Sequence, residues 1–163
     1  SYLAIGSNVG NRKYYINKAK YYLNKLPVII IKISKIYETP SWPNNKDPKF
    51  YNIVVKIKTN LKLNNLFIQI KKIEKKLGRK FKAKKNSPRT CDIDIIDFNG
   101  KASKLEINKN KLIVPHPRMI KRNFVLIPLF EIDKNWKHPQ KKTKIIDLID
   151  KLEGISFRSI KLI

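Results

Sequence analysis

The spacing of hydrophobic residues changes repeatedly between residues 2 and 98, and the order of these changes limits the fold more than any other feature. Alternating apolar residues predict strands, and apolar residues three or four positions apart predict helices. The predicted order is strand, helix, strand, strand, helix, strand, over residues 2–5, 12–26, 28–38, 50–58, 63–77 and 91–98. This βαββαβ order is typical of ferredoxin-like folds, in which an antiparallel sheet carries both helices on one face. We therefore predict an α+β fold of this kind.

Residues near the predicted helix ends support these boundaries. Asn11 is suited to cap the first helix, and Pro27 closes it. The second helix carries one apolar stripe, and Gly78 directly after it is suited to end a helix. Prolines exclude regular structure from residues 39–48, and the basic stretch 79–90 is predicted to be a loop because it has no periodicity.

The last third of the chain gives weaker patterns. They predict a helical turn near residues 118–121, an apolar segment at 124–130 and a helix at 143–152. No repeat and no linker separates this part from the rest. We therefore expect one domain over residues 1–163, with a C-terminal α/β extension packed onto the ferredoxin-like core.

The formal net charge is +25, which first suggests a protein that binds nucleic acid. The charge comes from 31 lysines but only 6 arginines, and the lysines are spread along the whole chain. Arginine is the preferred residue for contacts with phosphate and guanine. Lysine, isoleucine and asparagine are all abundant and share adenine- and thymine-rich codons, so compositional drift explains most of the charge. We expect no specific nucleic-acid partner.

No segment of the sequence predicts export or membrane insertion. The longest apolar run, Val28–Ile31, is far too short to cross a bilayer, and no signal or transit segment opens the sequence. The single cysteine, Cys91, rules out an internal disulfide and suits a reducing compartment. We expect a cytoplasmic monomer without a membrane partner, in which Cys91 is a small buried residue.

Two aspartates in the last predicted strand form a candidate metal site. Asp92 and Asp94 are two residues apart, so on a strand they share one face, about 6.6–6.8 Å apart along the backbone. Carboxylate oxygen is the ligand that Mg²⁺ prefers, with phosphate and water completing its shell. Asp97 has the opposite parity and is left out. The alternative is an edge strand with two solvated aspartates.

The surroundings of the pair favour phosphoryl transfer. Four of the six arginines fall between residues 79 and 122, on both sides of the aspartates. Arginine stabilises the charge of a phosphoryl transition state, and no Walker motif is present. His116, between two prolines, is suited to donate hydrogen bonds to phosphate, although a histidine in a surface turn is the alternative. We read His138, in a polar stretch, as a surface residue.

A second candidate site lies on the strand over residues 50–58. Phe50 and Asn52 share the face of that strand that is not apolar. A ring beside an amide suits a flat heteroaromatic ligand, which the ring would stack on and the amide would hydrogen-bond. The alternative is a partly covered surface phenylalanine.

Together these residues resemble the 6-hydroxymethyl-7,8-dihydropterin pyrophosphokinase family of the folate pathway. The resemblance runs from residue 3 to about residue 131, with all segments in the family's order. The most specific matches are Pro88-Arg89-Thr90-Cys91-Asp92-Ile93-Asp94 and Pro115-His116-Pro117-Arg118-Met119. Weaker matches are Ala4-Ile5-Gly6-Ser7-Asn8, Tyr37-Glu38-Thr39-Pro40, Phe50-Tyr51-Asn52, Ile73-Glu74 with Gly78-Arg79, Arg122-Asn123-Phe124 and Pro128-Leu129-Phe130-Glu131.

The resemblance implies transfer of the β,γ-pyrophosphoryl group of ATP to the pterin hydroxymethyl oxygen, with release of AMP. It implies two Mg²⁺ ions on Asp92 and Asp94, and loop arginines Arg79 and Arg89 that assist transfer. By the same resemblance the pterin pocket would include Thr39, Pro40, Trp42, Phe50, Asn52 and Phe124. The nucleotide would be contacted by Glu74, Ile95, Lys111, Ile113, His116 and Arg122.

The chain departs from the family pattern before Pro88, where Asn86 and Ser87 replace the usual Trp and Gly. Serine restricts the backbone more than glycine does, so we expect an effect on closure of the 79–90 loop. Two other interpretations stay open. One is a decayed relative that keeps the fold but not the activity, and the other is a basic RNA- or DNA-binding module on the same scaffold.

Overall fold

The computed structural model describes residues 1–41, 45–80, 87–107, 110–152 and 158–163. Its elements in chain order are β1 (Tyr2–Ser7), α1 (Arg12–Leu23), β2 (Val28–Ile33), β3 (Tyr37–Thr39), β4 (Phe50–Thr59), α2 (Leu63–Lys76), β5 (Asp92–Asp97), β6 (Ser103–Ile107), β7 (Asn110–Val114), the 3-10 helix η1 (Met119–Lys121), α3 (Asn123–Ile132), α4 (Ile145–Asp150) and β8 (Lys161–Leu162).

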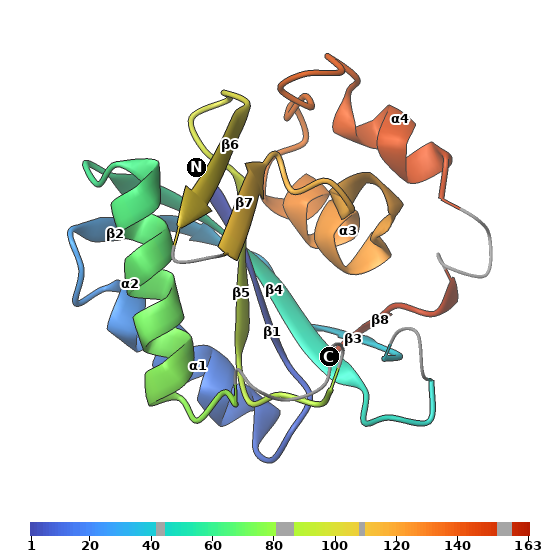
Figure 1. The fold of residues 1–163 in the computed structure, drawn as a ribbon. Coiled ribbons are helices and arrows are strands. Elements are labelled where there is room, and N and C mark those ends of the chain that lie inside the picture. Colours follow the sequence, from blue (N-terminus) through green and yellow to red (C-terminus); the bar gives the residue numbers. More distant parts are fainter. Residues whose placement is uncertain (42–44, 81–86, 108–109, 153–157) are drawn as a thin grey trace.

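The main sheet is antiparallel and has the strand order β5-β1-β4-β3-β8, while β2 pairs with the other half of β4 (Figure 1). The fourth predicted strand therefore lies beside the first, and the third lies on the first strand's other side. This is the arrangement that the βαββαβ order predicts, and the α+β, ferredoxin-like fold class is confirmed.

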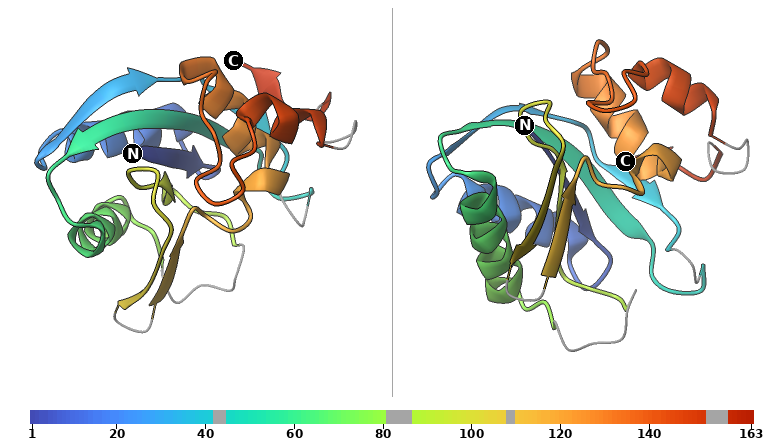
Figure 2. Two further views of the ribbon diagram at one scale, coloured as in Figure 1. Left: turned by 90° about the horizontal axis from the view of Figure 1, so that it is seen from above. Right: turned by 45° about the horizontal axis from the view of Figure 1, so that its top comes forward.

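Two separate cores cover the two faces of the sheet (Figures 1 and 2). Helices α1 and α2 pack on one face, against alternate residues of β1, β4 and β5 such as Ile5, Ile53 and Ile93. Helices α3 and α4 pack on the other face, against the residues of opposite parity, among them Val54 and Ile96. The helices of the core thus share one face as expected, and the C-terminal extension covers part of the second face.

The prediction of a single strand over residues 28–38 is wrong, because the structure divides it into β2 and β3. The division falls at Ser34, which is buried. The backbone N–H of Ser34 donates to the carbonyl of Val54 at 2.9 Å, but the return bond from the Val54 N–H goes to Ser34 Oγ, also at 2.9 Å. A side-chain oxygen thus replaces a backbone carbonyl and interrupts the ladder until Tyr37 pairs with Asn52.

The cap residues Asn11 and Gly78 act as predicted, but α1 ends at Leu23 and not at residue 26, because the N–H groups of Lys25 and Leu26 bond three residues back, to Tyr22 and Leu23, in a tighter turn before Pro27. The Asn11 side chain accepts a hydrogen bond from the Tyr14 N–H at 2.9 Å. Gly78 has a φ of +84° at the end of α2. The Gly78 N–H donates to the Lys75 carbonyl and the Arg79 N–H to the Glu74 carbonyl, each at 3.0 Å, which is the Schellman pattern. This turn fixes the backbone of Arg79 directly beside Glu74.

The C-terminal part extends the sheet and adds a hairpin. Strands β6 and β7 form a separate antiparallel hairpin next to β5, and β8 joins the main sheet at β3. The predicted turn near 118–121 and the predicted helix at 143–152 correspond to η1 and α4, and the apolar segment at 124–130 lies within the helix α3. In the described parts of the chain, no helix is both long and apolar enough to span a membrane.

Candidate active site

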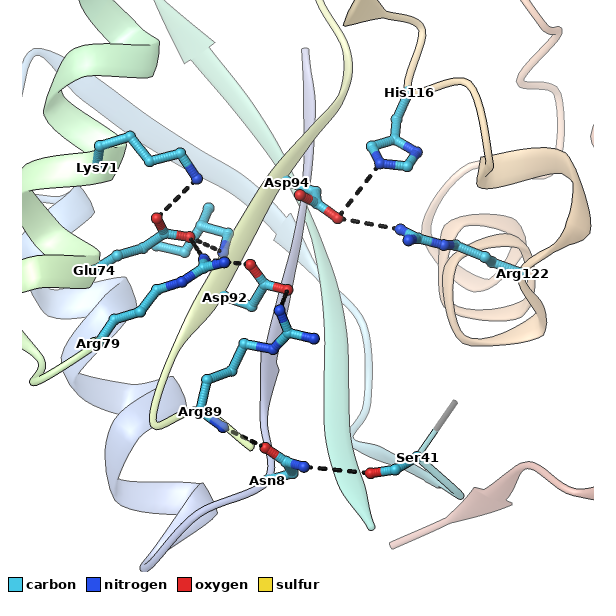
Figure 3. A network of polar contacts seen from close by, with 11 residues as sticks. Asn8, Ser41, Lys71, Glu74, Arg79, Arg89, Asp92, Asp94, His116 and Arg122 are labelled. Carbon is cyan, nitrogen blue, oxygen red and sulfur yellow. Dashed lines mark hydrogen bonds and ion pairs between the residues drawn. The ribbon is translucent and has the colours of Figure 1, made fainter. Parts of the chain in front are cut away.

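Asp92 and Asp94 lie on one face of β5 and point away from the core that holds Ile93 and Ile95 (Figure 3). The strand alternation that predicts this parity is therefore observed. The two carboxylates are partly exposed, with 23% and 31% of their side-chain surface accessible. Each is surrounded by basic side chains from other segments.

Asp92 is held by two arginines. Arg79, from the turn after α2, pairs with Asp92 Oδ1, and Arg89 Nη1 lies 3.4 Å from Asp92 Oδ2. Both arginines carry their positive charge at any physiological pH. The two guanidinium groups thus compensate the negative charge of a carboxylate that a bound metal ion would also compensate.

Glu74, on α2, is completely buried and holds Arg79 in place beside Asp92. Its Oε1 pairs with Arg79 and accepts the backbone N–H of Ile93 at 2.8 Å, and its Oε2 lies 2.7 Å from Lys71 Nζ. Burial raises the pKa of Glu74, although the charges of Lys71 and Arg79 oppose the rise. The Ile93 N–H lies between the two aspartates, so Glu74 fixes the strand that carries them.

Asp94 is paired on the other side of the cluster. Arg122 Nη1 lies 3.2 Å and His116 Nε2 3.8 Å from Asp94 Oδ2. Burial alone would raise the pKa of Asp94, but the charge of His116, which is protonated at the acid pH where Asp94 titrates, and the charge of Arg122 outweigh it and lower that pKa. Asp94 is therefore ionised at neutral pH.

His116 is held in one orientation by its own turn. Its Nδ1 accepts the backbone N–H of Arg118 at 3.2 Å, so in the neutral ring the proton sits on Nε2 and points toward Asp94. Burial lowers the pKa of His116 below its ordinary 6.5, and the charges of Arg122 and Arg118 act in the same direction while Asp94 opposes them. His116 is therefore a neutral hydrogen-bond donor at neutral pH.

A cavity of about 300 Å³ opens beside Asp94, between α2, β5 and β7. The predicted residues Ile95, Lys111, Ile113 and His116 all line it. Six further lining residues were not predicted for the site, namely Phe67, Lys71, Ile93, Leu112, Pro117 and Arg118. Lys71 lies three residues before Glu74 on the same face of α2, but helical spacing alone does not show that this face meets β5.

The other end of the cluster meets the predicted pterin residues. Asn52 is buried and donates to Thr39 Oγ1 at 2.9 Å. The Arg89 guanidinium lies 5.5 Å from the centre of the Phe50 ring, and Arg122 lies 5.3 Å from the centre of the Phe124 ring. Each ring is thus beside an arginine that pairs with one of the aspartates.

A glycine allows Phe50 and Asn52 to pack closely. A Cβ on Gly6 of β1 would lie 3.0 Å from Asn52 Oδ1 and 3.4 Å from Phe50 Cδ1. Any other residue at this position would press on the Asn52 amide and come into contact with the Phe50 ring.

Other predictions have mixed outcomes. Cys91 is buried in the core as expected, and burial raises the pKa of its thiol. The surface reading of His138 is wrong. It is buried, and its Nδ1 accepts the N–H groups of Gln140 and Lys141. Trp42 and Asn86 lie outside the described residues.

The donor set suits a metal that also binds phosphate. Among the residues that the structure describes, no group of three or more histidines, cysteines, aspartates or glutamates could hold a metal ion alone. Two carboxylates on one strand face fit Mg²⁺, which usually takes one or two protein carboxylates and completes its shell with substrate phosphates and water.

Comparison with known families gives one consistent result. The family model described as 7,8-dihydro-6-hydroxymethylpterin-pyrophosphokinase (HPPK) matches residues 2–134. A 2-amino-4-hydroxy-6-hydroxymethyldihydropteridine pyrophosphokinase of Aquifex aeolicus is 44% identical over 139 residues, which are 85% of this chain and 82% of that protein. The Bacillus subtilis protein of the same name is 41% identical over 133 residues, or 81% and 77% of the two chains.

Other relatives are much longer than this chain. The folic acid synthesis protein fol1 of Pneumocystis carinii is 36% identical over 93% of this chain, which spans only 20% of that protein. A Plasmodium falciparum HPPK-DHPS structure with SDX-DHP superposes with a TM-score of 0.76 at 17% identity, over 99% of this chain and 46% of the other. This second likeness supports the fold.

Proposed function

Since the chain belongs to the 7,8-dihydro-6-hydroxymethylpterin-pyrophosphokinase family of folate biosynthesis, we propose that it transfers the pyrophosphoryl group of ATP to 6-hydroxymethyl-7,8-dihydropterin at the cluster around Asp92 and Asp94. The observation that carries this proposal is the placement of the two carboxylates. Asp94 lines a cavity with basic residues in its wall, and the arginines paired with Asp92 and Asp94 stand beside the rings of Phe50 and Phe124.

In the proposed reaction the pterin hydroxymethyl oxygen attacks the β-phosphorus of ATP. The bond from the β-phosphorus to the oxygen that bridges it to the α-phosphate breaks, AMP leaves with that oxygen, and the hydroxyl proton passes to solvent. Little covalent work is left for the protein, which binds, aligns and neutralises the reacting groups.

Asp92 and Asp94 would hold Mg²⁺, and two ions are proposed because both the nucleotide and the acceptor oxygen need a cation. Bound Mg²⁺ would neutralise phosphate charge and favour ionisation of the acceptor hydroxyl. The arginines now paired with these carboxylates would then be available to the phosphates. Arg79 and Arg89 lie on the Asp92 side, where they would stabilise charge that develops during transfer.

The nucleotide would occupy the cavity beside Asp94. Ile95, Lys111 and Ile113 line this cavity and are proposed to contact the adenosine part of ATP. His116 also lines it, and Arg122 pairs with Asp94 beside it, where a neutral imidazole N–H and a guanidinium suit phosphate oxygens. Glu74 is proposed to act through Lys71 and Arg79, both of which it holds.

The pterin would bind between Phe50 and Phe124, with Asn52 on its polar edge. The buried Asn52 amide, oriented by Thr39, supports this proposal because a pterin ring offers matching donors and acceptors. Pro40 directly follows Thr39 and would line the same pocket. Trp42 stays a prediction from the resemblance alone.

Several wider statements are also proposals. We propose that residues 1–163 form one domain and act as a cytoplasmic monomer without a nucleic-acid or membrane partner. The first and last strands lie in the same sheet, which supports the single domain. Longer relatives carry this part within a larger protein, so a further folate enzyme in the whole natural protein is compatible with the proposal.

The deciding experiment is an assay of AMP release from ATP, Mg²⁺ and hydroxymethyl-dihydropterin. Asp92→Ala and Asp94→Ala should each abolish release while the fold survives. Asp150→Ala, at an exposed position of α4, is the matched control and should keep full activity. A folded wild-type protein that releases no AMP would refute the proposal.

Two binding measurements separate the alternatives. Pterin that binds in the presence of a non-hydrolysable ATP analogue, without any turnover, would indicate a decayed relative, for which Ser87 is the first residue to test. RNA affinity that depends steeply on salt but not on Asp92 would favour a nucleic-acid module.

A further inference from the structure

We propose that Asn8 is a positioning residue that links the acceptor pocket to Arg89, so that the two sides of the site are aligned together. The proposal rests on the proposed function, since it assigns a role in that reaction. Asn8 lies directly after β1, and its side chain is buried, with the residue only 2% exposed.

Every polar atom of the Asn8 side chain has a partner (Figure 3). The amide nitrogen donates to Ser41 Oγ at 3.2 Å and to the Pro48 carbonyl at 3.0 Å. The amide oxygen accepts the backbone N–H of Arg89 at 2.7 Å. The backbone repeats this last link, because the Asn8 N–H donates to the Arg89 carbonyl at 3.1 Å.

The two donor bonds hold both ends of one segment of the acceptor pocket. Ser41 lies two residues after Thr39, and Pro48 lies two residues before Phe50. Ser41 Oγ also donates to the Pro48 carbonyl at 2.6 Å, so a single amide group and a single hydroxyl tie the two ends together. The backbone positions of Thr39 and Phe50 therefore depend on Asn8.

The acceptor bond holds the start of the catalytic side. Arg89 lies with its Nη1 3.4 Å from Asp92 Oδ2, and its guanidinium stands over the Phe50 ring. Asn8 thus contacts Arg89 directly, and it also reaches Arg89 through Pro48 and the nearby Phe50 ring. A displacement of the acceptor pocket would therefore displace Arg89 both through the Asn8 side chain and through the Phe50 ring.

Only an amide side chain can make both the two donor bonds and the acceptor bond of Asn8. Aspartate accepts the Arg89 N–H but offers no donor to Ser41 or to Pro48, and alanine offers neither. Each buried hydrogen bond that is lost costs on the order of a few-fold to tenfold in the property that depends on it. The three links therefore predict separable losses.

The test compares Asn8→Asp, Asn8→Ala and Ser41→Ala with wild type in the AMP-release assay. Asn8→Asp should raise the KM for the pterin about tenfold and keep the affinity for a non-hydrolysable ATP analogue within about twofold. Asn8→Ala should also lower kcat about tenfold, because Arg89 loses its side-chain anchor. Ser41→Ala should show the smallest change, because the Asn8–Pro48 bond survives.

Amide hydrogen exchange at Arg89 gives a readout that does not depend on turnover. Exchange should speed up in Asn8→Ala and stay slow in Asn8→Asp, which keeps the acceptor. A purely structural role would lower the melting temperature of both Asn8 variants and leave the KM for the pterin and kcat unchanged below that temperature. That result would overturn the proposal, as would equal exchange in both variants.

The failure of this inference is distinguishable from failure of the proposed function. A wild-type protein without AMP release would overturn the function and, with it, the role of Asn8 in the reaction. A wild-type protein that releases AMP, together with Asn8 variants of unchanged kcat and KM, would overturn the role of Asn8 alone.

Discussion

Replacement of the buried Glu74 should cost more stability than any single surface change in this chain. Glu74→Ala removes the acceptor of the Ile93 N–H, and Ile93 is itself only 1% exposed. A buried donor without a partner costs about 1–3 kcal/mol. The same change removes the buried partner of Lys71 and Arg79. Removal of one partner of a fully buried ion pair lowers the free energy of unfolding by about 3–5 kcal/mol.

The structure places the expected loss at the lower end of that range. The Lys71 side chain is 30% exposed and can turn to water, and Arg79 keeps Asp92 as a partner. The raised pKa of Glu74 also shows that burial of its charge is itself unfavourable, which offsets part of the loss. We therefore expect Glu74→Ala to lower the free energy of unfolding by about 3 kcal/mol.

Glu74→Gln should cost about half as much, because its amide oxygen still accepts the Ile93 N–H while the charge is lost. Urea unfolding followed by tryptophan fluorescence measures both values. Glu106→Ala, at an exposed position of β6, is the matched control and should change stability by less than about 0.5 kcal/mol. The reasoning is refuted if Glu74→Ala and Glu106→Ala are equally stable, or if the glutamine variant loses as much as the alanine variant.

Three further predictions concern the site and its support. Gly6→Ala should weaken pterin binding several-fold, because its Cβ would press on the Asn52 amide, and calorimetry should show unchanged affinity for the ATP analogue. Unchanged pterin affinity would contradict this. Lys71→Met should weaken binding of the ATP analogue about tenfold, since Lys71 lines the cavity beside Asp94, and a pterin-only effect would contradict it. Burial lowers the pKa of His138, so its stabilisation is present above pH 6.5 and is lost as pH falls below that value. Relative to His138→Asn, which keeps an acceptor, wild type should lose stability as pH falls below 6.5, and parallel curves of stability against pH would contradict this.

The sequence was sufficient wherever a periodic pattern decides the structure. The parity of Asp92 and Asp94 follows from alternation along one strand, and the structure places both on the face opposite Ile93. The end of α2 follows from Gly78, whose left-handed φ few other residues adopt. These features depend on neighbours within a few residues, which a sequence pattern records.

The sequence was insufficient wherever distant segments decide the structure. Nothing within residues 28–38 indicates that Ser34 replaces a backbone acceptor of β4, because that bond joins residues 20 positions apart. The buried place of His138 depends on a turn in which its ring accepts two backbone N–H groups. Lys71 enters the site only because α2 packs beside β5, and helical spacing alone cannot specify that neighbour.

The alternation of side chains along β5 also determines at which stage Asp92 and Asp94 lose conformational entropy. Ile93 and Ile95 lock the strand into the core while Asp92 and Asp94 face the opposite way, and Glu74 holds the peptide between them. The two carboxylates therefore lose their freedom when the chain folds, and no equivalent rearrangement of the strand is left for the moment of transfer. In a site of this kind the polar groups are oriented in advance, and the reorganisation energy that water would require is largely avoided.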